Sequence, residues 1–319
     1  MENRALQIGA AAVMVALLLR LAGNWEIGAW EVGNTLLFLS TGRMVSATVP
    51  EEETVPEEEA TAEELPVEAV IPVFGEAEDS LVQVSGDWAV DTLSLLQKPL
   101  SWSLKGENPT VLILHTHATE SYVPTGTYQE TSPYRTLDNS YNMVSIGDRV
   151  AELLEAGGIR VIHDRTLHDY PSYNSAYSNA RSTIETCLAE NPDICLVLDL
   201  HRDAWEDGNG NQQGETVETD GKTAAKLMLV MGSDKGSLYY PNWEENLSLA
   251  VKLQALLESK HPSLCRPVKL AASRYNQDLS NGALLVEVGS AGNTHAEAIA
   301  AAELLAEGIL ALANGANIH

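Results

Sequence analysis

Two short apolar runs that lead into histidine constrain this chain more than any other feature of its sequence. Residues 111–120 read VLILHTHATE, so that Glu120 follows His117 after two residues, and residues 196–201 read LVLDLH, which ends in His201. Apolar runs of this length are typical of strands that are buried inside a sheet. We therefore expect both groups of polar residues to lie at the carboxyl ends of buried strands.

From Pro109 onward, apolar runs alternate with segments of helical periodicity, which predicts an α/β fold with a mostly parallel central sheet flanked by helices. The expected strands are residues 110–115, 159–163, 194–200, 224–232, 268–272 and 283–289, and the expected helices are residues 142–156, 173–189, 242–259 and 294–314. Residues 201–222 are polar and rich in Gly and Asn, which predicts a loop. In parallel sheets, functional groups gather at the carboxyl ends of the strands.

The N-terminal third of the chain predicts a membrane anchor and a spacer. Residues 5–23 are mostly apolar and long enough to span a bilayer, so we expect a single N-terminal anchor in the cell membrane. Arg4 favours a cytoplasmic N-terminus and Arg20 opposes it, so the character of the downstream domain, and not the charges, leads us to expect the remaining chain on the extracytoplasmic side. A cleaved signal peptide is the alternative. Eight glutamates in residues 51–64, with several prolines nearby, predict a disordered spacer. The expected organisation is an anchor region at residues 1–47, an acidic spacer at 48–85, a lead-in segment at 86–108 and a catalytic domain at 109–315.

The charge composition argues against one class of partner. Lys and Arg total 19 and Asp and Glu total 45, which gives a formal net charge of −26. A chain this acidic repels nucleic acid, and no basic patch interrupts the pattern. The three cysteines include no CxxC pair, which argues against a thiolate metal site.

His117, Glu120 and His201 together form the donor set of an open catalytic zinc site, in which three protein ligands leave one position free. The HxxE spacing lets His117 and Glu120 reach one metal ion from a turn that follows a strand. Glu287 lies in the apolar run at residues 283–289, where a buried carboxylate is costly unless it is paired or functional. Near a metal it would take a proton from the attacking water and pass it to the leaving amine. These residues predict a zinc-dependent hydrolase.

Several nearby residues are candidates for supporting roles. His115 competes with His117 for the first ligand position, because residues two apart in a strand share a face. Asp199 and Asp203 flank His201, and a carboxylate that hydrogen-bonds a ligand histidine would fix its orientation. The candidates for binding substrate carbonyl or carboxylate groups are Arg274, Arg135 and Asn276, with Arg202 as a further arginine.

Four motifs between residues 109 and 314 resemble the stage II sporulation protein P family: HTHATESY, RTLDNSYNMVSIGDRV, DLHRD and RYNQDLSNGALLVEVGSAGNT. The resemblance implies the fold of zinc N-acetylmuramoyl-L-alanine amidases and a membrane-anchored peptidoglycan hydrolase of endospore-forming bacteria. It implies cleavage of the amide that joins the lactyl group of muramic acid to L-alanine, during septal thinning and engulfment. Endopeptidase activity on stem peptides and partnership with sporulation proteins D and M are further implied.

By motif, the resemblance assigns His117 and His201 as metal ligands and Glu287 as the catalytic glutamate. It leaves two alternatives for the middle ligand. Glu120 fits the HxxE geometry of related zinc carboxypeptidases, whereas Asp138 falls where the wider amidase group places its ligand glutamate. Two rival functions are a zinc endopeptidase or carboxypeptidase that acts on stem peptides, and a non-catalytic scaffold that binds the wall.

Overall fold

The computed structural model of the chain describes residues 74–315, apart from residues 88, 101, 125–127 and 237. The expected membrane anchor and most of the expected acidic spacer lie outside these residues. Among the helices that are described, none is both long enough and apolar enough to cross a membrane.

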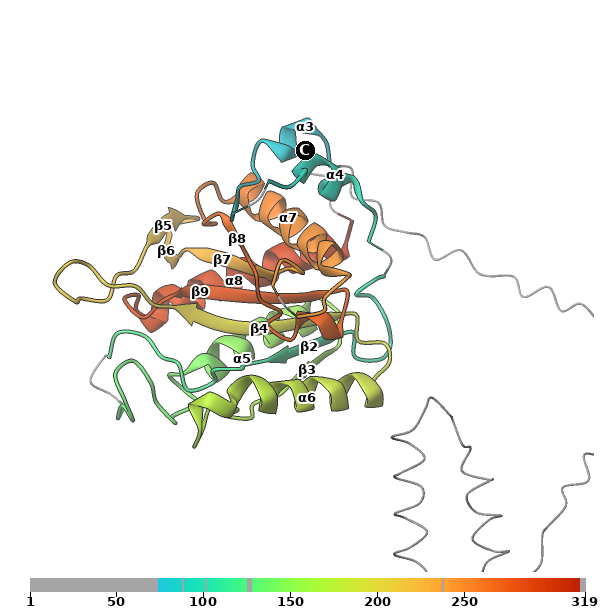
Figure 1. Ribbon diagram of the computed structural model, residues 1–319. Helices are drawn as coiled ribbons and strands as arrows, with labels where there is room; N and C mark the ends of the chain where they lie inside the picture. The colour runs from blue at the N-terminus through green and yellow to red at the C-terminus, as the bar shows by residue number, and fades with distance from the viewer. Residues whose placement is uncertain (1–73, 88, 101, 125–127, 237, 316–319) are drawn as a thin grey trace, which may run out of the picture. The chain divides into compact units, whose positions relative to one another are not determined.

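A central sheet of seven strands organises the fold, in the order β1-β8-β7-β9-β4-β2-β3 (Figure 1). All neighbouring strands pair in parallel except β7 and β9, which are antiparallel. The prediction of an α/β fold with a mostly parallel central sheet is therefore confirmed. The strands are β1 (Val84–Ser85), β2 (Val111–Leu114), β3 (Val161–His163), β4 (Leu196–Asp203), β7 (Leu227–Gly232), β8 (Val268–Ala271) and β9 (Ala283–Ser290).

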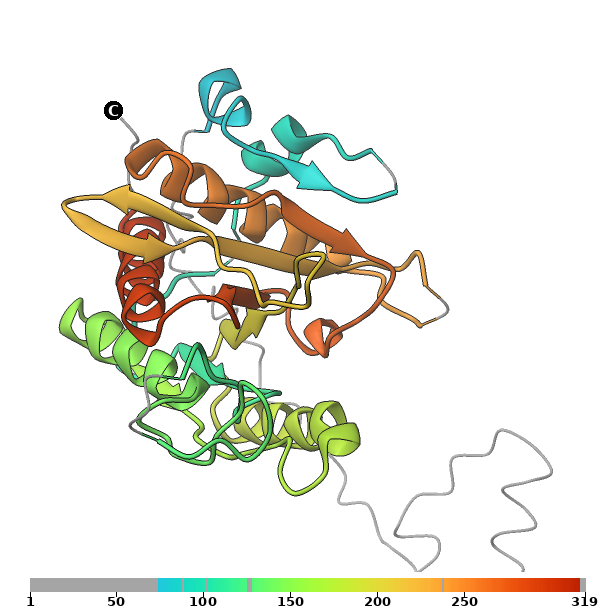
Figure 2. The ribbon, with the colours of Figure 1, turned by 90° about the vertical axis from the view of Figure 1, so that its left-hand side faces the viewer.

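Helices cover both faces of the sheet. On one face lie α5 (Met143–Ala156), α7 (Trp243–Lys260) and α8 (His295–Ala313), and on the other lie α6 (Ala176–Glu190) and the 3-10 turn η1 (Tyr173–Ser175) (Figure 2). Alternate residues of β2 divide between the two faces, as strand geometry requires. Ile113 packs in the large core with α5 and α8, whereas Leu112 and Leu114 pack against α6.

Local signals explain where the main helices begin. The Asn142 side chain caps α5 by accepting a hydrogen bond from the Val144 backbone N–H at 3.0 Å. Thr294 and Glu297 form a reciprocal capping box at the start of α8. All four helices expected after residue 109 are present, with ends within a few residues of those expected.

The ordered region begins earlier than the composition predicts. Residues 74–85, expected to belong to a disordered spacer, instead form α3 (Glu76–Asp79) and β1, and α4 (Thr92–Gln97) follows. Phe74 is buried, β1 pairs with β8, and Leu95 and Leu96 of α4 are buried against α7. These tertiary contacts offset the cost of ordering a segment whose own composition favours disorder.

The segment after β4 also differs from the expected loop. β4 continues to Asp203, so His201 lies within the strand, and β5 (Thr216–Thr219) and β6 (Lys222–Ala225) form a hairpin. Asp220 and Gly221 at its turn have φ values of 51° and 72°, as the tight turns that join two antiparallel strands often require. The run expected as one strand at 224–232 is therefore divided between β6 and β7.

Candidate functional site

The centre of the site is set by the pairing of β4 with β9. His201 pairs in register with Glu287 on the adjacent parallel strand, so their side chains point to the same face of the sheet. Asp199 pairs with Leu114, which faces α6, so this face is the α6 face. His117 follows β2 at the same edge, and the centroids of the His117 and His201 rings lie 5.4 Å apart.

Glu120 is brought to the histidines by a tight turn. Its backbone N–H donates to the His117 carbonyl at 3.1 Å, and its Oε2 lies 3.8 Å from His201 Nδ1. The carboxylate is buried, and it accepts hydrogen bonds from Arg135 Nη2 at 3.1 Å and from the Arg202 backbone N–H at 3.3 Å. The structure thus brings together the three residues His117, Glu120 and His201.

Asp199 connects the segment after β2 to β4. Its carboxylate accepts hydrogen bonds from the Thr116 backbone N–H at 2.8 Å and from Thr116 Oγ1 at 2.6 Å. Its Oδ1 also lies 2.9 Å from His201 Nε2, although the two atoms are not aligned for a hydrogen bond. Asp199 therefore restrains both the loop that carries His117 and the ring of His201.

The electrostatics of the site favour a cation. Burial opposes the charged form of His201, yet Asp199, Glu120 and Glu287 together raise its pKa to about 9. Burial raises the pKa of Glu287 to about 8, and burial lowers the pKa of His117. Three carboxylates that surround one buried histidine would be stabilised by a positive ion between them.

Three buried atoms at the site lack a hydrogen bond within the described ranges: His117 Nδ1, His201 Nε2 and Glu287 Oε2. An unpaired buried polar atom costs free energy, so a cluster of such atoms is suited to a ligand that would pair with them. Imidazole nitrogen and carboxylate oxygen are donors that zinc accepts, and the donor chemistry of the site therefore fits zinc. As the side chains stand, however, no group of three His, Cys, Asp or Glu in the described part of the chain is close enough to hold an ion.

The structure places both alternative ligands away from this cluster. His115 is fully buried on the α5 side of the sheet, where its Nε2 lies 2.9 Å from His163 Nε2 and its Nδ1 lies 3.1 Å from the Leu200 carbonyl. The expectation that His115 and His117 share a face fails because the strand ends at Leu114 and the chain turns. Asp138 is exposed, and its carboxylate accepts from the Ser140 backbone N–H in a local turn.

The residues expected to bind substrate are mostly engaged within the protein. Arg135 lies at the site but pairs with Glu120 and, at 2.7 Å, with Asp169. Arg274 pairs with Asp278 at 3.5 Å, and the Asn276 side chain donates to the Tyr177 carbonyl at 2.8 Å. Asp203, expected to support a ligand histidine, instead pairs with Arg266 at 2.7 Å, and Arg202 donates to the backbone carbonyls of Ser121 and Tyr134.

Sequence reasoning missed three tyrosines that border the site. Tyr173 stacks on His117 with ring centroids 4.5 Å apart, and Tyr177 meets the same ring edge-on at 5.6 Å. Tyr275 packs beside Tyr177 at 6.2 Å. The four-residue spacing of Tyr173 and Tyr177 at the start of a predicted helix was a usable signal, because residues i and i+4 share a helix face.

Solved structures of amidases share a limited likeness with the chain. N-acetylmuramoyl-L-alanine amidase AmiC2 of Nostoc punctiforme is 15% identical, with 66% of this chain and 96% of that chain covered and a TM-score of 0.38. The CwlD amidase from Clostridioides difficile, in complex with the GerS lipoprotein, is 16% identical, with 63% and 96% covered and a TM-score of 0.38. Scores this low carry no argument about the function of this chain.

Comparison of sequences identifies a family, which the comparison of structures does not. Stage II sporulation protein P of Bacillus subtilis (strain 168) is 32% identical over 215 residues, which cover 63% of this chain and 50% of that protein. The matched part therefore spans about half the length of this curated relative. The sequence model of the stage II sporulation protein P family matches residues 40–310, which is most of the chain. On this match, the chain belongs to the stage II sporulation protein P family.

Proposed function

We propose that this chain is a zinc-dependent amidase that cleaves peptidoglycan at the amide bond between the lactyl group of muramic acid and L-alanine. His117, Glu120 and His201 would hold the metal, and Glu287 would be the general base. The observation that carries the proposal is the convergence of His117, His201 and Glu287 at one edge of the sheet, where His117 Nδ1 and Glu287 Oε2 are buried without a hydrogen bond among the described residues. Membership of the sporulation family supports peptidoglycan as the substrate.

The residues of the site have complementary roles in this reaction. Zinc, when bound, would act as a Lewis acid that polarises the scissile carbonyl and lowers the pKa of a water. Glu287 pairs in register with His201 and shares its face of the sheet, a position from which a carboxylate can accept a proton from water and then give it to the leaving amine. Asp199, which contacts both Thr116 and His201, would hold the ligand segment and the ligand ring in place.

The test is hydrolysis of purified peptidoglycan by the full chain, with and without a chelator, followed by identification of the products. Release of stem peptides with a free L-alanine amino group, lost with chelator and restored by zinc, is the expected result. Cleavage within the stem would instead establish the rival endopeptidase or carboxypeptidase. Bound zinc without turnover on any muropeptide would establish the rival wall-binding scaffold.

A matched pair of substitutions, each of which replaces an acidic residue by its amide, tests which carboxylate binds the metal. Glu120→Gln should lower the zinc content of the purified protein, because the amide is a poorer ligand than the carboxylate. Asp138→Asn should leave the zinc content unchanged, because Asp138 is exposed and its carboxylate accepts a hydrogen bond from Ser140 in its own turn. The opposite pattern would transfer the ligand role to Asp138.

We also propose a location and binding partners for the protein. We place the domain on the extracytoplasmic side of the cell membrane, held by residues 1–47, with sporulation proteins D and M as partners. Removal of residues 1–47 should release the protein from the membrane fraction of cells that express it. Retention of the shortened protein in that fraction would show that another segment anchors it, and co-purification of the full chain tests each partner.

A further inference from the structure

We infer that the hydroxyl group of Tyr177 donates a hydrogen bond to the oxygen of the scissile carbonyl, and that Tyr177 is a further catalytic residue. The inference rests on the amidase function proposed above and names a group that would act on the substrate directly. It is carried by the position of the Tyr177 ring, by the packing that holds it and by the unbonded state of its hydroxyl.

Tyr177 lies in the first turn of α6, on the face of the sheet that carries His201 and Glu287. Its ring meets the His117 ring edge-on, with an interplanar angle of 90° and a centroid distance of 5.6 Å. The His117 ring in turn lies 5.4 Å from the His201 ring. Tyr177 is therefore in direct contact with His117, one of the two histidines that would bind the metal.

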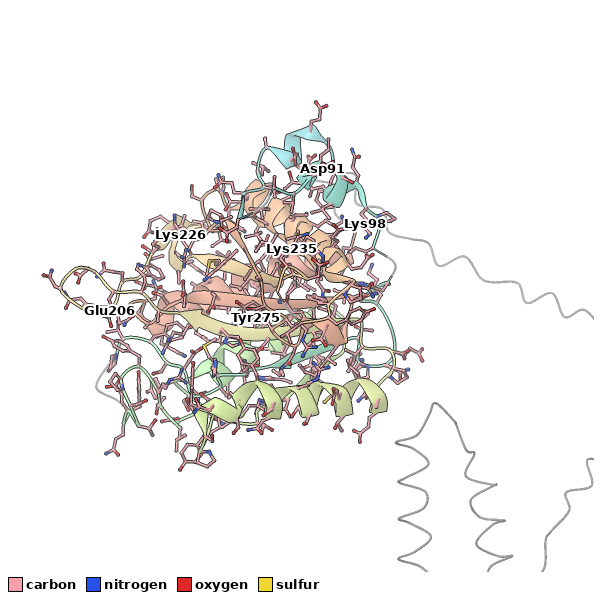
Figure 3. All side chains as sticks on the ribbon, viewed as in Figure 1. Asp91, Lys98, Glu206, Lys226, Lys235 and Tyr275 are labelled. Atoms are coloured by element: carbon pink, nitrogen blue, oxygen red, sulfur yellow. The ribbon has the colours of Figure 1, made fainter. Side chains whose placement is uncertain are left out.

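A strained loop holds the far side of Tyr177. Tyr275 and Asn276 both adopt positive φ, at 53° and 57°, which is costly for residues that carry a Cβ. This conformation places the Tyr275 ring beside Tyr177 and lets the Asn276 amide donate to the Tyr177 carbonyl at 2.8 Å. Figure 3 shows Tyr275 over the part of the sheet that contains β4 and β9.

The packing of Tyr275 ties this loop to the strand of Glu287. Its ring packs against Met228, Val230 and Leu285. Leu285 precedes Glu287 by two residues on β9, so both side chains point to the same face. Strained backbone that persists in a folded protein tends to occur at functional sites, and here it fixes the ring that borders Tyr177.

The hydroxyl of Tyr177 is available as a donor. Within the part of the chain that is described, the side-chain hydrogen bond that Tyr177 receives goes to its backbone carbonyl, from Asn276, and leaves the hydroxyl free to donate. The ordinary pKa of a phenol lies well above neutral pH, so the Tyr177 hydroxyl is uncharged and carries the proton that it would donate. The arginines nearby are already bound: Arg135 to two carboxylates and Arg202 to two backbone carbonyls.

The chemistry of amide hydrolysis needs such a donor. Water adds to the carbonyl carbon, Glu287 takes its proton, and negative charge develops on the carbonyl oxygen. When the C–N bond breaks, the proton from Glu287 passes to the amine of L-alanine. The Tyr177 O–H keeps its own proton throughout and stabilises the oxygen only while that oxygen is charged, which lowers the barrier rather than strengthening substrate binding.

The first test is Tyr177→Phe in the full chain, assayed on a soluble muropeptide. We expect kcat to fall by about 10²-fold with KM unchanged, which is the usual effect of removing one donor to a developing oxyanion. Zinc content and Tm should stay at wild-type values, because the hydroxyl has no partner to lose. The matched control is Tyr239→Phe, since Tyr239 is 81% exposed in the loop after β7 and should retain full activity.

The second measurement is the affinity for a phosphinate analogue of the scissile amide, whose tetrahedral oxygens resemble the charged carbonyl oxygen. Tyr177→Phe should bind it about 10²-fold more weakly and bind the stem-peptide product as the wild type does. A variant with wild-type kcat and analogue affinity would overturn the role of Tyr177 and leave the amidase standing. A variant with lower Tm would overturn the claim that the hydroxyl is unbonded. A wild-type chain that cleaves no amide would overturn the proposed function itself, and the inference with it.

Discussion

His201 and Glu287 stand directly opposite each other on the parallel strands β4 and β9. Backbone hydrogen bonds of the sheet fix the separation of these two side chains, so the proposed metal ligand and the proposed base belong to one rigid unit. His117 and Glu120 come instead from the turn after β2, which Asp199 ties to β4. Substitutions in these two units should therefore have effects on turnover and on zinc binding that can be measured separately.

Glu287→Gln should abolish most turnover while the protein keeps its zinc. The amide has nearly the same shape but cannot accept a proton, and loss of a general base typically slows a reaction by about 10²–10⁴-fold. The measurement is hydrolysis of peptidoglycan together with metal analysis of the purified variant. Hydrolysis at the wild-type rate would remove Glu287 from the mechanism, and loss of zinc would indicate that it is a ligand.

Asp199→Asn should weaken zinc binding by about 10–100-fold, as is usual when the group that orients a ligand histidine is lost. An asparagine cannot serve Thr116 and His201 as the carboxylate does, because one of its two oxygens is replaced by an NH₂ donor. Competition with a chelator of known affinity measures the change. Asp203→Asn is the control, since Asp203 pairs with Arg266, and equal losses in both variants would argue against the orienting role.

The parts of the fold that the sequence predicted are those with a strong local signal. The apolar runs of β2, β4 and β9 and the capped helices α5 and α8 needed no tertiary information. β1 and α3 were missed because their order depends on partners far along the chain, such as Gln254, which accepts a hydrogen bond from the Gln83 backbone N–H. The β5–β6 hairpin was missed although Asp220-Gly221 is a recognised turn signal.

The same distinction applies to the candidate site. The proximity of His117, Glu120, His201 and Glu287 could be predicted because their strands are obvious and parallel strands end at one edge. Tyr275 was missed although it lies between two residues that were singled out, Arg274 and Asn276. Which of three consecutive residues faces a site depends on the left-handed backbone of this loop, and the sequence contains no glycine there to reveal it.

Gly147→Ala should lower the free energy of unfolding, although alanine favours the helical conformation more than glycine does. A Cβ at this position in α5 would lie 2.5 Å from His163 Nε2 and 2.6 Å from His115 Nε2. The overpacking cost of about 1–3 kcal/mol should exceed the gain of about 1 kcal/mol in helix propensity. Urea unfolding should therefore show a lower midpoint.

The same substitution in a protein that lacks the His163 ring tests whether this ring is an obstacle. In a protein that already carries His163→Ala, one of the two obstructing rings is gone and the His115 ring has room to shift, so Gly147→Ala should become less destabilising. The comparison of the four proteins by urea unfolding gives the coupling between the two positions. An equal loss of stability in both backgrounds would show that His163 is not the obstacle.

Lys252 should make the stability of the domain rise at alkaline pH. Its side chain is fully buried in α7, where its Nζ donates to the Leu95 carbonyl and to Ser248 Oγ, and burial lowers its pKa from 10.5 to about 8. Below pH 8 the lysine is charged in both states. Between pH 8 and 10.5 the folded protein has lost the proton that the unfolded chain still binds, so the free energy of unfolding rises across this window.

The rise attributable to Lys252 is at most about 3 kcal/mol, and it is isolated by comparing the wild type with Lys252→Met at several pH values. The variant should lack the rise, because methionine fills a similar volume without a titratable group. Lys260→Met is the control, since Lys260 is partly exposed in a surface ion pair with Glu307 and should retain the wild-type dependence. The contradicting result would be unfolding free energies of the wild type and Lys252→Met that change in parallel from pH 7 to 10.5. The buried amine would then keep its proton in the folded state. Its charge would be stabilised by the Leu95 carbonyl and by the Phe74 ring, whose centroid lies 5.7 Å from the amine.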